Sequence, residues 1–519
     1  MRKIIIYIVS FFFLFQVNLT AQKHDYNWIY GYGDFTSSEL DRNGLWLDFN
    51  GIDTKASVFI KDEFFFLTSL SYSDASGNLQ LYSDGCALYD EHGTLLENGD
   101  NINQDSFCDN TDGFRSGYSA EQGMIALPSS DEDIISLFYS EEYLADDTLG
   151  VSGSRGRVRL LRAIIDLKAN VVLSKKEIVL DTLTGNILSA TKHSNGQDWW
   201  ILNQDYFSNE YKCLLVSEGE VIDTVSSFIG NQVLSPDAPQ SNFSPDGKIF
   251  ARYDVLDELE LYDFDRNTGQ LSNFRLIDIP GTLELPTSGG LSFSGSSRFL
   301  YVNDAIGIWQ YDLHAADVEA SVVQVAEREV FITGQDIFVN GVFTFFYRMA
   351  LAPDCRIYMS SRSGVDRIYV IMHPELKGVA CEVVQNIKIP AWNAGTTPHF
   401  PNYRLDTAPF CDDSKDFPSN LMTTVSASTG EPDLPTRIEV FPNPASDYCK
   451  VYLKNLTQRK VHFVLYDVLG REVLTRDISL VAGATMESIQ LEDISDGIYV
   501  YTLYDGVQIL RSDRLIVKK

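Results

Sequence analysis

One short pattern recurs along this chain and limits the folds that it can adopt. The stretch Asn242–Tyr262, NFSPDGKIFARYDVLDELELY, reads as a turn followed by paired strands. Residues 244–247, SPDG, have the composition of a type I turn, because proline sets φ at the second position and glycine accepts the positive φ that returns the chain into a hairpin. The flanking runs are rich in aromatic and branched residues, which is typical of strands.

Copies of this unit occur both after and before it. FSPDGKIFARY at Phe243 aligns with FSGSSRFLYV at Phe293 and LAPDCRIYMS at Leu351, and a second strand follows each at a similar distance. Weaker relatives begin at Leu70, Met124 and Ala190. Six units roughly 45 to 60 residues apart match the period of propeller blades with about four strands each.

A closed ring is the favoured arrangement because one small antiparallel sheet cannot cover both of its faces, whereas radial stacking buries them. We therefore expect an all-β chain with a six- or seven-bladed β-propeller over residues 22–405, seven being preferred. For closure, we expect Asn27–Phe35 and Leu45–Phe49 to pair with Ala391–Leu405. An open β-solenoid and two stacked sandwiches are the alternatives.

The first 21 residues have the features of a secretory signal peptide. Arg2 and Lys3 precede an apolar run from Ile4 to Phe15, and the predicted cleavage lies between Ala21 and Gln22. An uncleaved membrane anchor is the alternative, but the run is shorter than the ~20 residues that span a bilayer. We expect no integral membrane segment after cleavage.

Charge restricts the partners of this chain. Its 72 acidic and 41 basic residues give a net charge of −31, which would repel nucleic acid phosphates, so we expect no nucleic acid partner. Hydrophobic residues make up 44 % of the chain, enough for a substantial core.

Seven cysteines are widely spaced without a CxxC pair, which argues against zinc and thiol-redox chemistry. In an exported protein some should pair, and we predict Cys86 with Cys108 and Cys355 with Cys381. Reduced, buried cysteines are the alternative. The odd count leaves at least one thiol without an intramolecular partner.

The residue composition and pattern change twice in the last part of the chain. Residues 406–436 are rich in proline, serine, threonine and acidic residues, which predicts a linker. Residues 437–519 then contain seven short strand-like runs separated by turns, which predicts a small C-terminal β-sandwich.

Four ordered motifs in this segment, FPNP, LYDVLGR, ISDGIY and the terminal LIVKK, resemble the type A C-terminal sorting domain of the type IX secretion system of Bacteroidota. The residues that carry the resemblance are Pro442, Asn443, Pro444, Asp467, Gly470, Gly497, Tyr499 and Lys518. The resemblance implies passage through the periplasm, recognition by the type IX secretion machinery, and a secreted or outer-membrane cell-surface location. An ordinary accessory sandwich is the alternative. The repeat region resembles WD-like and TolB-like propellers. This resemblance assigns no catalytic residues to the chain.

Catalytic and metal-binding patterns are weak. Asp263–Gly269 places oxygen atoms at alternate positions like a calcium loop, but the twelfth residue is Phe274 rather than glutamate, which favours a hairpin turn. Acidic groups fall in predicted loops, at 131–133, 141–142 and 146–147. The histidines show no HxH or HExxH spacing, and no nucleophile motif has a strand-turn-helix context. We therefore expect no catalytic site, no metal and no cofactor.

Aromatic residues are the best indication of binding. Exposed tryptophans at a propeller mouth would stack on sugars or hold a peptide, although interblade packing also needs large rings. The six are Trp28, Trp46, Trp199, Trp200, Trp309 and Trp392. We predict a secreted, non-enzymatic module that binds an unknown protein or glycan ligand. The alternatives are an extracellular hydrolase with its site in the propeller funnel and a structural component of a surface layer or motility apparatus.

Overall fold

In the computed structural model the chain divides into two compact units, Met1–Arg328 with Thr333–Leu421, and Met422–Lys519 with Glu329–Ile332. The structure describes residues 22–31, 43–60, 65, 67–103, 108, 117–143, 157–185, 187–232, 240–254, 258–280, 289–329, 332–333, 342–393, 395–421, 437–454, 460–467, 471–479, 484–504 and 509–519. The predicted signal peptide and Ala21 lie outside these residues.

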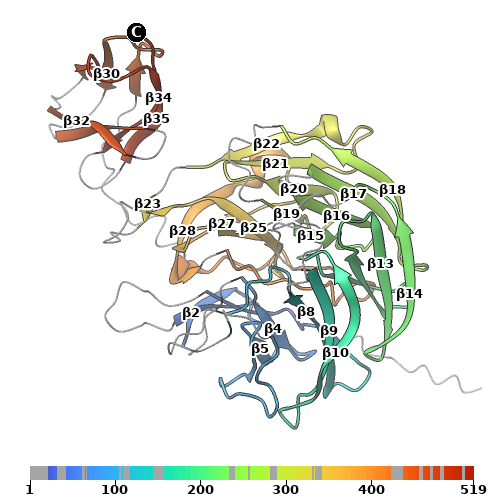
Figure 1. Cartoon of the computed structure of the whole chain (residues 1–519). Coiled ribbons are helices and arrows are strands. Elements are labelled where there is room, and N and C mark those ends of the chain that lie inside the picture. Colours follow the sequence, from blue (N-terminus) through green and yellow to red (C-terminus); the bar gives the residue numbers. More distant parts are fainter. Residues whose placement is uncertain are drawn as a thin grey trace, which may run out of the picture. The chain divides into compact units, whose positions relative to one another are not determined.

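The described residues of the first unit contain seven antiparallel sheets of three or four strands, and we number them as blades 1–7 in chain order (Figure 1). Blade 1 contains β1 (Asn27–Tyr30), β2 (Asn43–Asp48) and β3 (Lys55–Ile60), and blade 2 contains β4 (Leu70–Ser73), β5 (Leu79–Ser83) and β6 (Leu88–Asp90). Blade 3 contains β7 (Met124–Pro128), β8 (Ile134–Tyr143), β9 (Arg157–Asp166) and β10 (Val171–Leu183), and blade 4 contains β11 (Ser189–Lys192), β12 (Trp199–Gln204), β13 (Glu210–Ser217) and β14 (Glu220–Phe228).

The remaining blades have four strands each. Blade 5 contains β15 (Gln240–Phe243), β16 (Ile249–Asp254), β17 (Glu258–Asp265) and β18 (Gln270–Ile277), and blade 6 contains β19 (Gly290–Phe293), β20 (Phe299–Asn303), β21 (Gly307–Asp312) and β22 (Val323–Glu327). Blade 7 contains β25 (Phe346–Leu351), β26 (Ile357–Ser361), β27 (Val365–Ile371) and β28 (Val383–Asn393). The 3-10 turns Glu319–Ser321 and Gly378–Cys381 lie within blades 6 and 7, respectively, and the two-stranded sheet of β23 (Ile332–Thr333) and β24 (Val342–Phe343) lies between these two blades in the sequence.

Each pair of neighbouring blades shares a buried apolar cluster. For example, Trp200 of blade 4 packs with Phe250 and Tyr262 of blade 5. A further cluster joins Trp28 of blade 1 to Tyr358 of blade 7, so the contacts return to their starting point. The ring is therefore a closed seven-bladed propeller, as predicted, and burial of both faces of each sheet stabilises it.

The repeated turn has the same geometry in three successive blades. Gly247 donates its N–H to the carbonyl of Ser244, as Ser297 does to Ser294 and Cys355 does to Ala352. The last residue of each turn has φ of 69°, 64° and 63°, respectively. Only one of the three is glycine, so the copies at 293 and 351 hold a left-handed residue that carries a side chain.

The predicted strand exchange at closure is wrong. β2 pairs with β1 on one side and with β3 on the other, while β28, which contains Ala391, pairs only with β27 among the described residues. The segment that follows β28 leaves the sheet instead of continuing along it. Side-chain packing between blades 7 and 1 closes the ring, because each sheet already has its own hairpins.

The predicted linker also begins too early. Residues 406–421 lie against the propeller: Phe417 and Leu421 enter the cluster between blades 7 and 1, and Cys411 is disulfide-bonded to Cys355. The amide N–H of Thr54 donates to the carbonyl of Asp416 at 3.1 Å. The composition of the segment is that of a loop, but its few apolar residues are sufficient to anchor it.

The second unit is the predicted β-sandwich. One sheet contains β29 (Arg437–Phe441), β30 (Tyr448–Lys454) and β33 (Ala484–Gln490), and the other contains β31 (Lys460–Tyr466), β32 (Glu472–Ser479), β34 (Gly497–Tyr504) and β35 (Ile509–Val517). A single core that includes Val451, Phe463 and Tyr501 lies between them. Among the described residues, no helix has the length and apolar character to span a membrane.

Candidate functional site

The segment of residues 395–405, called here the axial segment, crosses the centre of the ring. Thr397 donates to the carbonyl of Arg348 in blade 7 at 3.3 Å, and Tyr403 donates to that of Ala126 in blade 3 at 2.7 Å. Asn402 donates to the carbonyl of Pro245 in blade 5 at 2.7 Å. A short segment can reach the inner strands of opposite blades only near the ring axis, where an open propeller would have its channel.

A half-buried histidine, His399, lies at the middle of the axial segment. The Nε2 atom of His399 lies 2.8 Å from the carbonyl oxygen of Leu188. The Nδ1 atom of the same ring lies 3.0 Å from the side-chain amide nitrogen of Gln122. Burial lowers the pKa of His399 to about 4, so the ring is neutral near pH 7. The side-chain amide of Gln122 also donates to the backbone carbonyl of Ser241 and accepts a hydrogen bond from the backbone N–H of Ser241.

A buried acid lies beside it. Glu121, 4 % exposed, accepts hydrogen bonds from the hydroxyl of Tyr347 and from the guanidinium of Arg348. Burial lowers the pKa of Arg348 to about 9, which still leaves it charged near pH 7. Blades 3 and 7 are thus joined across the axis by one ion pair. The acid and the histidine that a funnel enzyme would need are therefore present, but both bind groups of the protein itself.

A small cavity lies at the axis. It has a volume of about 60 Å³ and lies between the axial segment and the inner strands β11, β15, β19 and β25. This volume has room for water molecules but is far below the roughly 300–1,000 Å³ of typical small-molecule sites. Its polar lining consists of serine, threonine and asparagine residues together with His399.

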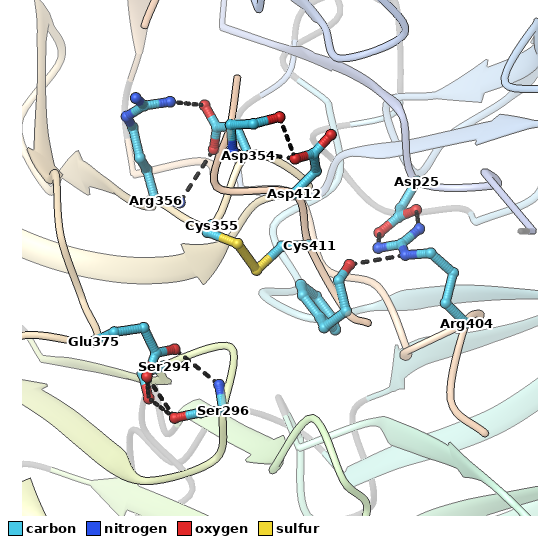
Figure 2. The surroundings of a disulfide bond; sticks show 12 residues. Asp25, Ser294, Ser296, Asp354, Cys355, Arg356, Glu375, Arg404, Cys411 and Asp412 are labelled. Atoms are coloured by element: carbon cyan, nitrogen blue, oxygen red, sulfur yellow. Dashed lines mark hydrogen bonds and ion pairs between the residues drawn. A yellow bond between two sulfur atoms is a disulfide. The ribbon is translucent and has the colours of Figure 1, made fainter. Parts of the chain in front are cut away.

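The end of the axial segment and the residues that follow it attach the segment to the ring (Figure 2). The Arg404 guanidinium forms a buried ion pair with Asp25, and its Nε donates to the carbonyl of Phe410 at 2.8 Å. The amide N–H of Asp412 donates to the carbonyl of Pro353 at 2.9 Å. These contacts join the beginning and the end of the propeller sequence.

The structure corrects one predicted disulfide. Cys86 and Cys108 form a disulfide with a Cα–Cα distance of 5.4 Å, but Cys355 pairs with Cys411 rather than Cys381. Cys381 lies buried in the cluster between blades 6 and 7, and burial raises the pKa of its thiol to about 11. Proximity in sequence suggested the wrong partner because the return of the chain across the ring was not visible in the sequence.

Two of the other candidate groups, at Asp265 and Asp131, serve as turn residues, whereas residues 141–142 lie on strand β8 and not in the loop that was predicted. Asp265 accepts from the N–H of Asn267 at 2.8 Å and from Thr268, as expected of a hairpin turn. Among the acidic groups, Asp131 accepts the N–H of Asp133 at 3.1 Å, and Glu141 lies 3.8 Å from Arg159. Residues 146–147 lie outside the described part of the chain, within which no three His, Cys, Asp or Glu side chains gather as they would around a metal ion.

Most tryptophans pack between blades. Trp28, Trp199, Trp200 and Trp309 are buried, whereas Trp46 and Trp392 are half-buried. Trp46 lies on β2, where its Nε1–H donates to the side-chain oxygen of Asn27 at 3.0 Å and its ring meets the edge of Phe59.

The sorting-motif residues organise the end of the second unit. Asn443 donates to the carbonyl of Arg514 at 2.8 Å and accepts from the N–H of Ile516 at 2.9 Å. Lys518 donates its backbone N–H to the carbonyl of Ala445 at 2.8 Å, so β35 lies beside the proline-rich segment.

The other motif residues stabilise loops. Both peptide bonds before Pro442 and Pro444 are cis. Asp467 accepts from the N–H of Arg471 at 3.0 Å, and Tyr499 donates to the carbonyl of Ser495 at 2.9 Å. At Gly497 an added Cβ would lie 3.3 Å from the Tyr499 ring. Gly470 lies outside the described residues.

A protein-family model for the secretion system C-terminal sorting domain matches residues 439–518. These residues are a type IX sorting domain. The sorting domain covers the sandwich of the second unit, and it indicates secretion to the cell surface or the exterior. It also implies an interaction with the type IX secretion machinery. The chain is therefore a secreted propeller protein whose sorting domain follows the ring.

Solved structures resemble the chain only at low identity. PorZ, described as an essential bacterial surface component of the type IX secretion system of Porphyromonas gingivalis, is 10 % identical with a TM-score of 0.26, over 92 % of this chain and 68 % of PorZ. The Dos1 propeller is 11 % identical with a TM-score of 0.33, over 66 % and 92 %. A putative 6-phosphogluconolactonase from Bacteroides fragilis is 11 % identical with a TM-score of 0.33, over 89 % and 98 %. No curated protein matches the sequence.

The functional arrangement that sequence reasoning missed is the occupied axis. Its one signal was the segment 395–405, which contains two prolines and a histidine between the last strand and the expected linker. Proline removes a backbone donor and disfavours a sheet position, so a proline-rich segment after a final blade is a candidate for leaving the sheet.

Proposed function

We propose that this secreted propeller is a non-enzymatic module that binds a protein or glycan partner outside the cell. The observation that carries the proposal is the axial segment, which fills the position where the blades converge. Ligands then have to bind on the outer faces or edges of the ring rather than in a central funnel.

The hydrolase alternative is less well supported. A general acid or base must reach a substrate proton within hydrogen-bonding distance and should have a pKa near the working pH. Glu121 is paired with Arg348, and burial holds the pKa of His399 at about 4. Both groups bind protein atoms, and the adjoining cavity of about 60 Å³ is too small for a substrate.

A paired screen tests the proposal. The purified chain would be applied to immobilised glycans and to extracellular proteins of the source cells, and in parallel to chromogenic glycosides, esters, phosphates and peptides. We expect saturable binding without turnover. The hydrolase would be established instead if the chain turned over a substrate and Glu121→Gln abolished that turnover without changing the thermal midpoint. A complete lack of ligands would favour a structural role.

A further inference from the structure

We propose that a groove on the edge of blade 1 is a binding site for a neutral glycan. The groove has a volume of about 500 Å³ and lies between β2 and β3 on one side and residues 416–420 on the other. This volume falls within the roughly 300–1,000 Å³ typical of small-ligand sites. The inference rests on the proposed binding function and names the class of ligand and its location.

The strand register places an aromatic ring and polar groups on one face. Trp46 lies opposite Ser57 and Asp48 lies opposite Lys55 in the β2–β3 pair, and directly opposed residues project to the same face. All four line the groove. Because Trp46 is held by its hydrogen bond to Asn27, the ring has a fixed position. A half-buried, fixed indole offers the flat apolar surface on which a sugar ring can stack.

The second wall comes from the segment that sequence composition had suggested was a linker. Thr54 N–H donates to the carbonyl of Asp416, and the Asn420 amide donates to the carbonyl of Ala56 at 2.7 Å, so this wall is bonded to the edge of β3. Thr54 is fixed in turn by its hydroxyl, 3.2 Å from the buried carboxylate of Asp354. The groove is therefore built from two bonded segments that are distant in the sequence.

Several polar side chains in the groove have no hydrogen-bond partner within the part of the chain that the structure describes. The carboxylates of Asp53 and Asp416 and the hydroxyls of Ser57 and Ser419 line it without a hydrogen bond to any described residue. Carboxylates accept hydrogen bonds and hydroxyls both accept and donate. Acceptors and hydroxyls around an aromatic ring match the hydroxyl groups and apolar ring face of a carbohydrate better than they match an apolar peptide.

Charge distinguishes neutral from acidic glycans and from metal ions. The groove has three carboxylates, Asp48, Asp53 and Asp416, against one ammonium group, Lys55. With the net charge of −31 on the whole chain, this excess disfavours uronate or sulfated glycans. Calcium takes about six to eight oxygen ligands. Asp48 already accepts two hydrogen bonds from Asn50, so few carboxylate oxygens remain for a metal ion. The ammonium group of Lys55 in the same groove would repel the ion.

The test uses the full chain and a defined panel of glycans. Immobilised β-glucan, mannan, galactan and chitin oligosaccharides would be compared with polygalacturonate and heparin, and titration calorimetry would measure the affinity for any glycan that binds. We expect a neutral glycan to bind, with at least a tenfold loss in Trp46→Ala and in Asp53→Asn. Glu132→Gln, which removes an exposed carboxylate elsewhere, is the matched control and should bind like the wild type.

Other outcomes overturn the groove assignment. Trp46→Phe retains an aromatic surface and should recover part of the affinity, and unchanged thermal midpoints would show that the variants fold. A glycan whose binding neither variant weakens, binding limited to the acidic glycans, or calcium binding alone would each refute the neutral-glycan site. A protein partner without any glycan would refute it while leaving the proposed function intact, and the absence of any ligand would refute both.

Discussion

Asp25 and Arg404 form an ion pair across 379 residues of sequence, with the Nη2 of Arg404 2.8 Å from the Oδ2 of Asp25. Each side chain is only 2 % exposed. Asp25 precedes the first strand of blade 1, and Arg404 belongs to the axial segment that follows blade 7. The pair therefore closes the ring where strand exchange was expected, and it does so with two desolvated charges.

Replacing Asp25 with asparagine should destabilise the propeller by about 3–5 kcal/mol, because the Arg404 charge would remain buried without its counter-charge. Urea unfolding followed by tryptophan fluorescence would measure the loss. Asp263→Asn, which breaks a surface pair with Arg275, is the control and should cost less than about 1 kcal/mol. Equal effects of the two variants would contradict the closing role.

Two histidines whose pKa values are lowered should make the fold acid-sensitive. Burial lowers the pKa values of His24 and His399 to about 4, below their ordinary value of 6.5, so the unfolded chain binds more protons between these values. Their stabilising contribution is complete above pH 6.5 and is lost as pH falls through 4, by on the order of 3 kcal/mol for each.

The pH dependence of the unfolding free energy from pH 4 to 7 would check this point. His399→Gln should flatten the curve over that range, whereas replacing His92, whose side chain is 78 % exposed, should not change its shape. A wild-type curve that His399→Gln leaves unchanged would mean that the imidazole binds protons equally in the folded and unfolded states, which would contradict the lowered pKa.

The disulfide between Cys355 and Cys411 should stabilise the fold by lowering the conformational entropy of the unfolded chain. Its 56-residue separation corresponds to about 4 kcal/mol in the loop-entropy model. We expect Cys411→Ser to lower the urea midpoint and Cys381→Ser to have a smaller effect. Peptide mapping without reduction should recover the Cys355–Cys411 peptide, and a Cys355–Cys381 peptide would contradict the pairing.

Gly247 should not tolerate a side chain. Its φ is +69°, and a Cβ would lie 2.8 Å from both the Thr191 hydroxyl and the Arg266 side chain. Gly247→Ala should lower the free energy of unfolding by about 1–3 kcal/mol, because alanine is strained in the left-handed backbone conformation and its Cβ would displace a neighbouring side chain. Gly196→Ala, at φ of +74° with open space around it, separates the backbone cost from the contact cost and should be the milder change in thermal unfolding.

Removal of Arg437–Lys519 should trap the protein in the periplasm, because the sorting domain carries the export signal. Cell fractionation with an antibody against the propeller would locate the truncated chain. Its folding can be verified by the thermal midpoint of the propeller. Normal delivery of the truncated chain to the cell surface would show that export does not depend on this domain.

The local features were predictable because they depend on neighbouring residues. The SPDG turn at 244–247 identified a hairpin, its spaced relatives indicated blades, and the motifs from Pro442 to Lys518 marked the sorting domain. The closing arrangement was not predictable in the same way. Cys355 lies 26 residues from Cys381 and 56 from Cys411, and only the return of the chain across the ring brings the more distant cysteine within bonding distance.

The sequence by itself determined the strand pattern, the repeat and the export signal, since backbone preferences and short motifs act over a few residues. Tertiary structure alone decided that the axis is occupied and that Glu121, Arg348 and His399 meet there. It also decided that Trp46 and Asp416 share a groove. The physical reason is that these contacts join residues hundreds of positions apart, and their energies arise from burial and pairing that exist only after the ring has closed.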